Sequence, residues 1–372
     1  MNVLHLITEL DVGGAERQLV ALAPRFNRSR WNVTVAYFHG SGHLRPELEE
    51  DGIAVTKLDS RHKGDLGALV RLVRLLREQR IDILHTHLIQ ADLLGLLAAQ
   101  LTRVPVTIST KHSVDYFTRQ GRWLTKVDTF ANRHFTRLVA VSESVKNHYI
   151  KTQHLPPAKI EVIYNGIDIA GLECAPPISR TELGVAPDTK IICAVGTLSE
   201  RKGQSFLLEA WPTVLTRHPS SVLVFVGDGP LQASLEATAK SAGLHDSVRF
   251  LGRRSDVPAI LHAADLFVLP SQTEGFGLAM VEAMAASVPV IATTVGGVPE
   301  LARHEHEALL ISPRNAPALA GAINTLLDDP GRATALATAA RQRVEQFSIQ
   351  HTVRRLESCY ESLLAPAANA QT

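Results

Sequence analysis

Two glutamates stand alone in the apolar segment LPSQTEGFGLAMVEAMAA, residues 269–286. Glu274 lies in a glycine-rich turn, and Glu282 follows eight residues later among apolar side chains. An acid in apolar surroundings is costly unless a polar group uses it. Carboxylates accept paired hydrogen bonds from neighbouring hydroxyls, and the N–H groups of such a turn can hold a phosphate. The segment therefore predicts a site for a hydroxyl-rich ligand.

Both glutamates also have structural interpretations. Glu274 could cap the helix that the pattern predicts from about Leu278, since acids are frequent just before a helix. Glu282 could be an ordinary solvent-facing residue of that helix, although its apolar neighbours argue against this. Because Glu282 would lie only about one turn inside the helix, the two acids can face the same edge of a binding cleft.

A pair of cations precedes another predicted helix. In AVGTLSERKGQSFLLEA, Arg201 and Lys202 stand just before a helix that begins near Gly203. Two cations beside the positive end of a helix dipole are each destabilised by a few tenths to about 1 kcal/mol unless they share an anion. Such a local conflict indicates function, and the alternative is a pair of ordinary solvated basic residues.

A diglycine follows the first apolar run of the chain. Gly13 and Gly14 open a predicted helix whose free N–H groups and dipole suit an anion, and the missing side chains let a ligand approach the backbone. The spacing is not GxGxxG, so a dinucleotide fingerprint is excluded. A simple tight turn is the alternative.

Three histidines follow predicted strands in the first half of the chain: His85, His87 and His112. A His-x-His pair at a strand end is compatible with zinc, but no third ligand has metal-ligand spacing nearby, so no metal site is predicted. His112 is expected to hydrogen-bond a ligand, and the other two are expected to be structural. No DxD pair is present to hold a divalent ion on a diphosphate, so cations such as Lys202 are expected to neutralise one.

The elements that must position these residues alternate along the chain. Short β-branched runs alternate with helical patterns in two series, from NVLHLIT to VPVTIST and from KIICAVGT to VPVIATT. That alternation predicts βαβ units and parallel sheets, hence two doubly wound α/β domains. The Gly-, Pro- and Asp-rich stretch at 166–188 is the predicted linker. Each motif follows a strand, where ligands bind in open α/β sheets, and a cleft between the domains is expected.

The composition agrees with a soluble two-domain protein. The 372 residues are 45% apolar and 20% charged, which excludes a disordered or fibrous chain. Three scattered cysteines fit neither a disulfide framework nor a CxxC metal site, and no apolar run reaches the roughly 18 residues that a membrane span needs. The first residues lack the basic stretch of a signal peptide. A cytoplasmic protein is expected.

The charge is distributed unevenly. Residues 1–165 carry 22 Lys and Arg against 16 Asp and Glu, net +6, and the remainder has a net charge of −5. Residues 115–137 interleave aromatic and basic side chains, and arginines recur at three-residue steps over 71–80. This mixture is typical of a surface that meets anionic lipid; an ordinary helix that buries its aromatics is the alternative. A nucleic-acid binder is not indicated, since RNP-like stretches and basic recognition helices are missing.

Taken together, the diglycine, the basic pair, FVGDGP, the segment with both glutamates and the downstream PVIATTVGGVPELA resemble the retaining GT-B glycosyltransferases of family 4. The resemblance covers nearly the whole chain. It implies two facing Rossmann-like domains that move a sugar from a nucleotide diphosphate sugar, UDP first and GDP next, to a hydroxyl acceptor. It implies neither metal nor cofactor, because the leaving phosphate takes the acceptor proton while cations stabilise its charge.

The resemblance also implies domain boundaries and a setting. The acceptor-side domain is expected at 1–170, joined by a C-terminal helix at about 348–364 that crosses back to it, and the nucleotide-sugar domain at 171–347. The basic and aromatic first half favours a glycan or lipid-linked acceptor of cell-envelope polysaccharide or glycolipid synthesis. Peripheral contact with the inner face of the cytoplasmic membrane is expected with it.

Position by position, the resemblance assigns roles to residues of this chain. The expected catalytic residues are His112 on the transferred sugar, Lys202 on the diphosphate and Glu274 on the sugar hydroxyls. The other expected donor contacts come from Gly13, Gly14, Arg201, Arg253, Arg254, Gly275, Phe276, Gly277, Leu278 and Glu282. Thr197 departs from the pattern, because it stands where the family often has an arginine, and this leaves more of the diphosphate charge to Arg201.

Two alternatives from other functional classes stay open. A sugar-nucleotide epimerase or a phosphorylase of the same fold would also have a two-domain cleft. The epimerase would convert the donor in the absence of an acceptor. A phosphorylase should show a lysine in a pyridoxal-phosphate context, and no such context is recognised in the sequence. A non-catalytic glycan-binding module would keep the cleft without turnover, but the intact Lys202, Glu274 and Glu282 argue against it.

Overall fold

The chain forms two compact units. The structure is a computed structural model that describes residues 1–365 apart from residue 12, residue 63 and residues 114–121. Unit 1 comprises Met1–Gly166 and Ile349–Thr372, and unit 2 comprises Ile167–Ser348. The boundary predicted from the sequence lies after residue 170, whereas the structure divides the chain after Gly166. The prediction also returned the last helix to the first domain.

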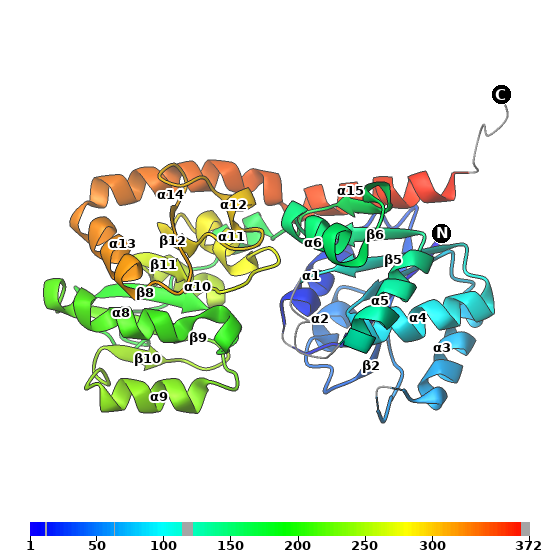
Figure 1. Cartoon of the computed structure of the whole chain (residues 1–372), viewed down its shortest axis with the longest axis horizontal. Helices are drawn as coiled ribbons and strands as arrows, with labels where there is room; N and C mark the ends of the chain where they lie inside the picture. The colour runs from blue at the N-terminus through cyan, green and yellow to red at the C-terminus, as the bar shows by residue number, and fades with distance from the viewer. Residues whose placement is uncertain (12, 63, 114–121, 366–372) are drawn as a thin grey trace. The chain divides into compact units, whose positions relative to one another are not determined.

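Unit 1 is built on a seven-stranded parallel sheet with the order β3-β2-β1-β4-β5-β6-β7 (Figure 1). Its strands are β1 (Asn2–Glu9), β2 (Asn32–His39), β3 (Ala54–Lys57), β4 (Ile83–His87), β5 (Val106–Lys111), β6 (Arg137–Ala140) and β7 (Ile160–Val162). Its helices are α1 (Gly14–Leu22), α2 (Arg45–Glu50), α3 (Leu66–Glu78), α4 (Ile89–Thr102), α5 (Arg122–His134), α6 (Glu143–Gln153) and α15 (Ile349–Leu364), with 3-10 turns η1 (Ala23–Arg25) and η2 (Pro157–Lys159).

Helices cover both faces of this sheet, and β1 shows why. Val3 and Ile7 belong to a hydrophobic cluster with α1 and α15, whereas Leu4 and Leu6 belong to another with α3 and α4. Alternate residues of a strand point to opposite faces, so a strand covered on both sides is apolar along its length. His5 interrupts this run on the face that α1 and α15 cover.

Unit 2 repeats the plan with six parallel strands in the order β10-β9-β8-β11-β12-β13. Its strands are β8 (Lys190–Val195), β9 (Ser221–Val226), β10 (Val248–Phe250), β11 (Leu266–Leu269), β12 (Val290–Thr293) and β13 (Leu309–Ile311). Its helices are α7 (Ile169–Glu173), α8 (Gln204–Arg217), α9 (Gln232–Ser241), α10 (Val257–Ala263), α11 (Leu278–Ala285), α12 (Val298–Leu301), α13 (Ala316–Asp328) and α14 (Pro330–Val344), with 3-10 turns η3 (Glu200–Lys202) and η4 (Glu345–Phe347).

The strand order reverses beside the first strand of each sheet. In unit 1, β1 lies between β2 and β4, and in unit 2, β8 lies between β9 and β11. Ligands of doubly wound sheets bind beyond the carboxyl ends of the strands at such switch points. The predicted fold class, two doubly wound α/β domains, is therefore confirmed. Among the described residues, no helix is both long enough and apolar enough to cross a membrane.

Candidate functional site

Lys202 and Glu274 form an ion pair at the switch point of unit 2. Lys202 ends η3 in the loop after β8, and Glu274 lies in the loop after the neighbouring strand β11. Lys202 Nζ lies 2.7 Å from Glu274 Oε2, and the Ser271 hydroxyl donates to the same oxygen at 3.1 Å. The side chains of Lys202 and Glu274 are only 16% and 9% exposed. The structure thus brings the two predicted catalytic residues of this unit into direct contact.

The ion pair determines the charge of Glu274. Burial alone would raise the pKa of this carboxyl, but the charge and hydrogen bond of Lys202 outweigh burial and hold the pKa below its usual value. The charge of Arg201 and the Ser271 hydroxyl act in the same direction. Glu274 is therefore an ionised hydrogen-bond acceptor at neutral pH.

Glycines let three loops meet at this point. Gly203 has φ +67°, and a Cβ there would lie 2.1 Å from the carbonyl oxygen of Pro270 in the loop after β11. Gly296, in the loop after β12, has φ +53°, and its Cβ would lie 1.7 Å from the carbonyl oxygen of Glu274. No side chain fits at either position, so the backbone approach that positions Glu274 depends on glycine.

Arg201 is held through its backbone, which leaves its side chain available. The Gln272 amide N–H donates to the Arg201 carbonyl at 2.8 Å, and this bond joins the loops after β8 and β11. Within the described part of the chain, the Arg201 guanidinium forms no direct ion pair, although its charge helps to lower the pKa of Glu274. Thr197, which stands where an arginine is expected, accepts a hydrogen bond from Gln204 at its carbonyl.

The helix predicted from about Leu278 begins at that residue as α11. Gly277 precedes it with φ +111° and makes no side-chain cap bond to the helix. Phe276 is buried and packs edge-on against Phe347, with ring centroids 5.7 Å apart, so only its backbone can serve a ligand. Glu282 lies half-buried on α11, one turn past its start.

Arg253 and Arg254 are engaged by acids. Arg253 pairs with Asp228 at 3.0 Å and Arg254 with Asp256 at 2.6 Å, and the four side chains are between 37% and 47% exposed. The Gly227 N–H donates to the Gly252 carbonyl at 2.8 Å, joining the loop after β9 to the chain that follows β10. Both guanidinium groups are therefore engaged by acids of the same unit.

The predicted residues Gly13, Gly14 and His112 belong to unit 1. Gly13 caps α1 in extended conformation, φ −158°, and a Cβ on it would lie 2.2 Å from Glu16 Oε2. The carboxyl of Glu16 thus folds back over the start of α1, where the diglycine predicted a ligand anion. Burial, assisted by the charges of Glu9 and Asp11, raises the pKa of Glu16 to about 7. Sequence reasoning missed Glu16, although an acid in a first helical turn signals such a contact.

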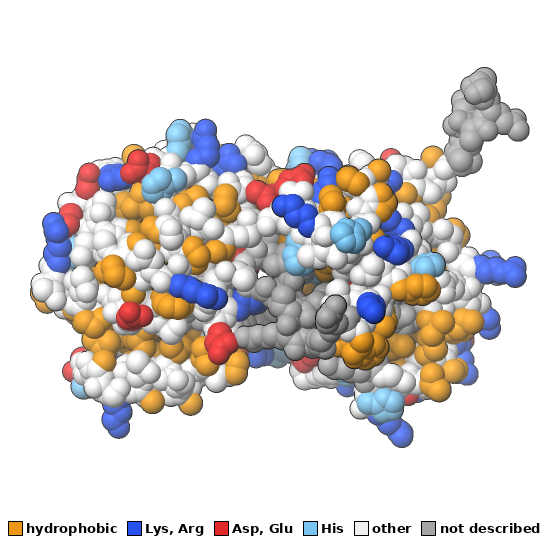
Figure 2. Space-filling model, in the orientation of Figure 1, with side chains coloured by type: hydrophobic (Ala, Val, Ile, Leu, Met, Phe, Trp, Pro, Cys, Tyr) orange, Lys and Arg blue, Asp and Glu red, His pale blue; other side chains and the backbone are white. Residues whose placement is uncertain are grey.

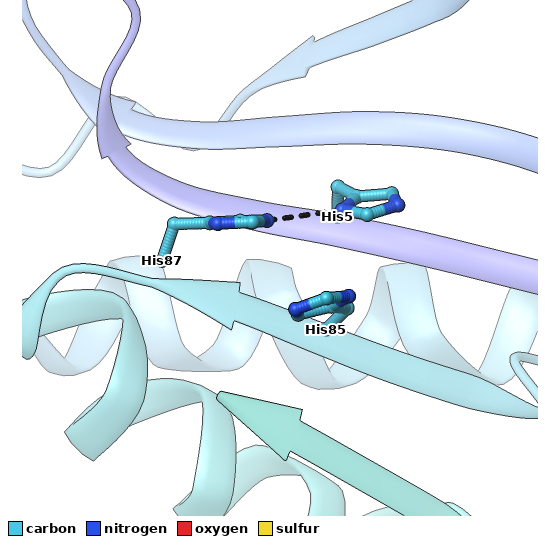
Figure 3. Close-up of side chains that lie close together, drawn as sticks. All are labelled: His5, His85 and His87. Carbon is cyan, nitrogen blue, oxygen red and sulfur yellow. Dashed lines mark hydrogen bonds between the residues drawn. The ribbon is translucent and has the colours of Figure 1, made fainter. Parts of the chain in front are cut away.

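The histidines form a buried cluster with a third potential metal ligand that the sequence did not predict. The sequence offers no third ligand near His85 and His87, but the fold supplies His5, because β1 and β4 pair with His5 opposite His85 (Figure 3). One ring nitrogen from each lies within 4.8 Å of the others. His5 Nδ1 and His87 Nε2 share a hydrogen bond at 3.0 Å, and both nitrogens of His85 have hydroxyl partners. Each ring nitrogen of the three histidines thus has a hydrogen-bond partner.

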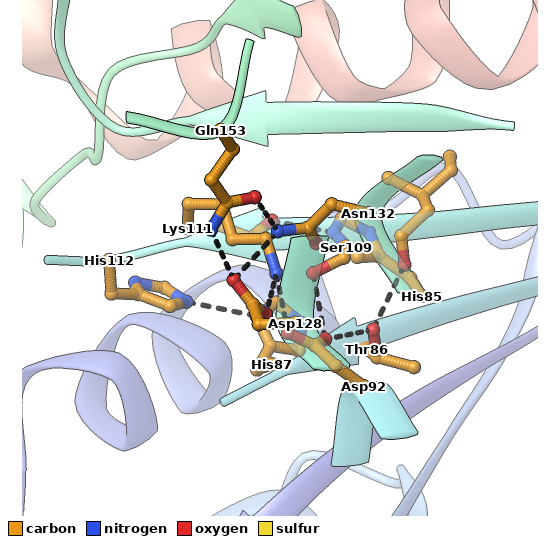
Figure 4. A network of polar contacts seen from close by, with 12 residues as sticks. His85, Thr86, His87, Asp92, Ser109, Lys111, His112, Asp128, Asn132 and Gln153 are labelled. Carbon is orange, nitrogen blue, oxygen red and sulfur yellow. Dashed lines mark hydrogen bonds and ion pairs between the residues drawn. The ribbon is translucent and has the colours of Figure 1, made fainter. Parts of the chain in front are cut away.

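A buried charge network lies beside His112, at the end of β5 (Figure 4). Lys111 Nζ contacts Asp92 at 2.6 Å and Asp128 at 3.7 Å, and all three side chains are almost fully buried. Burial opposes the charge of Lys111, but the two aspartates outweigh it and raise its pKa. Burial also raises the pKa of Asp128, against the charge of Lys111. The network joins α4, β5 and α5, and so fixes the strand end that carries His112.

Two doubly wound α/β units, one with a buried Lys–Glu pair at its strand ends, define the GT-B architecture. Comparison with known families agrees with it. The family model for glycosyl transferases group 1 matches residues 177–343, and that for glycosyltransferase family 4 matches residues 12–170. The chain belongs to this family of glycosyltransferases.

Individual relatives extend this finding. The UDP-Gal:alpha-D-GlcNAc-diphosphoundecaprenol alpha-1,3-galactosyltransferase of Escherichia coli is 30% identical over 311 residues, which cover 80% of this chain and 79% of the relative. The Anabaena protein HepE, solved with UDP-glucose, is 27% identical with a TM-score of 0.86, over 97% of this chain and 100% of that chain. The sucrose-phosphate synthase of Thermosynechococcus elongatus, 23% identical with a TM-score of 0.81 over 98% and 100% of the two chains, shares the fold.

Proposed function

We propose that the protein is a retaining glycosyltransferase that moves a hexose from a UDP-sugar to a hydroxyl of a glycan or lipid-linked acceptor in cell-envelope polysaccharide or glycolipid synthesis. The observation that carries this proposal is the buried contact of Lys202 with Glu274 at the strand ends of unit 2. A carboxylate held ionised beside a cation suits a ligand that is rich in hydroxyls at one end and anionic at the other. UDP is favoured because relatives with this fold are named for, or were solved with, UDP-sugars.

We propose the following roles for residues of unit 2. Lys202 and Arg201 neutralise the donor diphosphate in place of a divalent ion, so that neither metal nor cofactor is required. Glu274 accepts hydrogen bonds from the sugar hydroxyls, and Glu282 accepts them from the ribose. The turn at 275–278, which leads into α11, holds phosphate through its backbone, and the backbone at 253–254 reads the base.

The proposed transfer needs no protein nucleophile. The bond from the anomeric carbon to the phosphate oxygen breaks, the acceptor oxygen bonds to the same face of that carbon, and the leaving phosphate takes the acceptor proton. Lys202 and Arg201 stabilise the negative charge that grows on the phosphate. In unit 1, His112 hydrogen-bonds the transferred sugar, and the diglycine at 13–14 lies against phosphate or sugar.

We also propose that unit 1 contacts an anionic membrane through three neighbouring helices, α3, α4 and α5, which we call the apolar-basic face. Its exposed apolar side chains are Leu66, Val70, Leu97, Leu101, Trp123 and Phe130. Figure 2 shows hydrophobic side chains gathered over these helices. Its exposed cations are Arg74, Arg77, Lys126 and Arg133. Apolar and basic groups together are the two signals that stable binding to anionic lipid requires.

Only part of the segment 115–137 supports this surface. Trp123 and Phe130 stand one heptad apart on α5 and are both about two thirds exposed, 66% and 63%. Phe135, in contrast, is buried in the core of unit 1, so its assignment to a basic aromatic surface is wrong. Residues 115–121 lie outside the described part of the chain.

Incubation with a panel of nucleotide sugars tests the proposed function. We expect slow hydrolysis of a UDP-hexose without acceptor, transfer in the presence of an undecaprenyl-diphosphate sugar, and a product whose anomeric configuration, read by NMR, matches the donor. Both reactions should persist in excess EDTA. Conversion of the donor to its epimer without acceptor would favour the epimerase alternative, and binding without any turnover would favour the non-catalytic module.

A further inference from the structure

A continuous chain of hydrogen bonds runs from His112 into the core of unit 1. All its members are buried except His112, which is half-buried, and none belongs to the ion pair of unit 2. In order, they are His112, His87, His5, Tyr360, His85 and Thr110.

The first half of the chain crosses between two strands. His112 Nε2 lies 3.1 Å from His87 Nδ1, and His87 Nε2 lies 3.0 Å from His5 Nδ1 (Figures 3 and 4). The rings of His5 and His87 are stacked, with centroids 5.3 Å apart. The parallel pairing of β1 with β4 holds these rings in place, because Ile7 lies opposite His87 and His5 opposite His85.

The second half passes through the last helix. The Tyr360 hydroxyl on α15 lies 3.4 Å from His5 Nε2 and 2.6 Å from His85 Nδ1. His85 Nε2 then lies 2.6 Å from the Thr110 hydroxyl on β5. Three strands and the C-terminal helix thus contribute to one hydrogen-bonded chain.

The four imidazoles are neutral at physiological pH. Burial lowers the pKa of His5 to about 3 and that of His112 to about 4, and it lowers the pKa values of His85 and His87 well below their usual value. A neutral imidazole has one N–H donor and one acceptor nitrogen. The direction of each bond therefore sets the direction of the next, and the chain has two aligned arrangements.

The contacts of Tyr360 favour one of the two arrangements. Both hydroxyl contacts of His85 measure 2.6 Å, so neutral His85 accepts from one hydroxyl and donates to the other. The Tyr360 hydroxyl has one proton, and its 3.4 Å contact to His5 is too long for a good O–H donor bond, which leaves His85 as the acceptor of that proton. Donation along the short contact makes His5 Nε2 the donor to the Tyr360 oxygen, His87 Nε2 the donor to His5, and His112 Nε2 the donor to His87. His112 Nδ1 is then left with its lone pair.

We propose that His87, His5 and Tyr360 are positioning residues that hold His112 in its Nε2–H tautomer, so that its Nδ1 offers an acceptor to a hydroxyl of the bound sugar. The sugar in this statement rests on the proposed function, whereas the tautomer does not. A fixed tautomer matters because an unaided neutral imidazole exchanges its proton between the two nitrogens and would present the sugar with a donor part of the time.

Long-range 15N–1H NMR of histidine-labelled protein tests the proposal without any substrate. We expect His112, assigned by loss of its signals in His112→Asn, to show a single Nε2–H tautomer. Tyr360→Phe removes one oxygen from the middle of the chain, and His112 should then become a mixture of tautomers. Tyr37→Phe is the matched control, since Tyr37 is buried in the same hydrophobic cluster as Tyr360 but does not belong to the chain of hydrogen bonds. This variant should leave the tautomer of His112 unchanged.

A second variant and a metal analysis complete the test. His87→Gln breaks the contact next to His112 and should have the same effect on the tautomer. Tyr360→Phe and His87→Gln should each lower kcat/KM about fivefold, which corresponds to the free energy of one hydrogen bond. A single unchanged His112 tautomer in Tyr360→Phe and His87→Gln would overturn the proposal, whatever the activity. Stoichiometric zinc in the purified protein would also overturn it, because a ring nitrogen of His5, His85 or His87 bound to zinc cannot share a hydrogen bond. Failure of transfer with every donor, with the tautomer shift intact, would overturn only the proposed function.

Discussion

At the scale of single residues, the site of unit 2 is an acid and a cation that neutralise each other inside the protein. The sequence predicted both residues because each violates a local rule, an acid in an apolar segment and a cation at a helix start. Their direct contact was not predicted, since the residues stand 72 positions apart. Ser271 was missed as well, because a serine in a turn is too common to single out. The contact depends on the close backbone approach at Gly203, which no local pattern reveals.

Breaking this pair should cost stability as well as function. A buried ion pair that loses one partner leaves an unpaired charge, so we expect Lys202→Met and Glu274→Gln each to lower the free energy of unfolding by about 2 kcal/mol, with a smaller loss in the double variant. Urea denaturation measures all three. Lys190→Met is the control, because Lys190 pairs with Asp265 at 2.9 Å but is 54% exposed, and it should cost less than about 1 kcal/mol. Additive effects in the double variant would contradict the coupling.

Glu16 should make stability depend on pH. Its pKa is about 7 in the folded protein against an ordinary value of 4.5 for a glutamate side chain in water, so the folded state binds more protons than the unfolded chain between these values. The contribution of Glu16 to the free energy of unfolding is fully present below about pH 4.5 and is lost as the pH rises through 7. Glu16→Gln keeps the uncharged shape, and we expect it to raise the free energy of unfolding by about 2 kcal/mol at pH 8 and little at pH 5.

Thermal unfolding of the wild-type protein and of Glu16→Gln at pH 5 and pH 8 measures this effect. Glu50→Gln is the control, because Glu50 is exposed on α2, and its change in Tm should be the same at pH 5 and pH 8. An equal change in Tm at pH 5 and pH 8 for Glu16→Gln would show that its carboxyl titrates normally.

At the scale of elements, loops at the carboxyl ends of adjacent strands build the site. The alternation of strand and helix patterns was sufficient to predict two doubly wound sheets, and every motif was placed after a strand. Strand pairing supplied what the patterns could not. His5 and His85 meet only because β1 and β4 are neighbours in register, although 80 residues separate them. A periodic pattern states that a strand exists but not which strand it pairs with.

The glycine that supports Glu274 offers a test at this scale. Ala at position 296 would place a Cβ within 1.7 Å of the Glu274 carbonyl oxygen, in a left-handed conformation. We expect Gly296→Ala to displace this loop and to weaken binding of a UDP-sugar at least tenfold, measured by calorimetry. Gly321→Ala on α13 meets no neighbouring atom, and it should stabilise the protein by up to about 1 kcal/mol without changing affinity. Unchanged affinity in Gly296→Ala would contradict the role of the loop.

The apolar-basic face of α3, α4 and α5 is tested by flotation with vesicles. We expect wild-type protein to float with phosphatidylglycerol vesicles at moderate salt and not with phosphatidylcholine vesicles. Trp123→Ser/Phe130→Ser and Arg74→Glu/Arg77→Glu should each lose most of this binding, because one signal alone gives only marginal affinity. Arg217→Glu/Arg332→Glu makes the same charge change in unit 2 and should still float. Absence of wild-type binding to anionic vesicles would reject the membrane proposal.

At the scale of the whole molecule, sequence motifs identify the family of the chain. The contacts within its sites, in contrast, are seen only in the three-dimensional structure. The resemblance drawn from the diglycine, the basic pair and the two glutamates indicated the family that the comparisons then showed. The last helix, α15, completes unit 1 from the far end of the chain, with Cys359 and Tyr360 in its core. No sequence pattern indicated that Tyr360 also reaches a buried histidine, since hydrogen bonds over 275 residues depend on tertiary packing.

Calorimetric titration with UDP and with UDP-glucose, in EDTA, tests most directly that the cation and the acid of unit 2 hold the two ends of one donor. We expect wild-type protein to bind both ligands, Lys202→Met to weaken the binding of both at least tenfold, and Glu274→Gln to retain affinity for UDP but lose the extra affinity that the sugar provides. Absence of binding of either ligand to wild-type protein, or equal affinities in all three proteins, would contradict it.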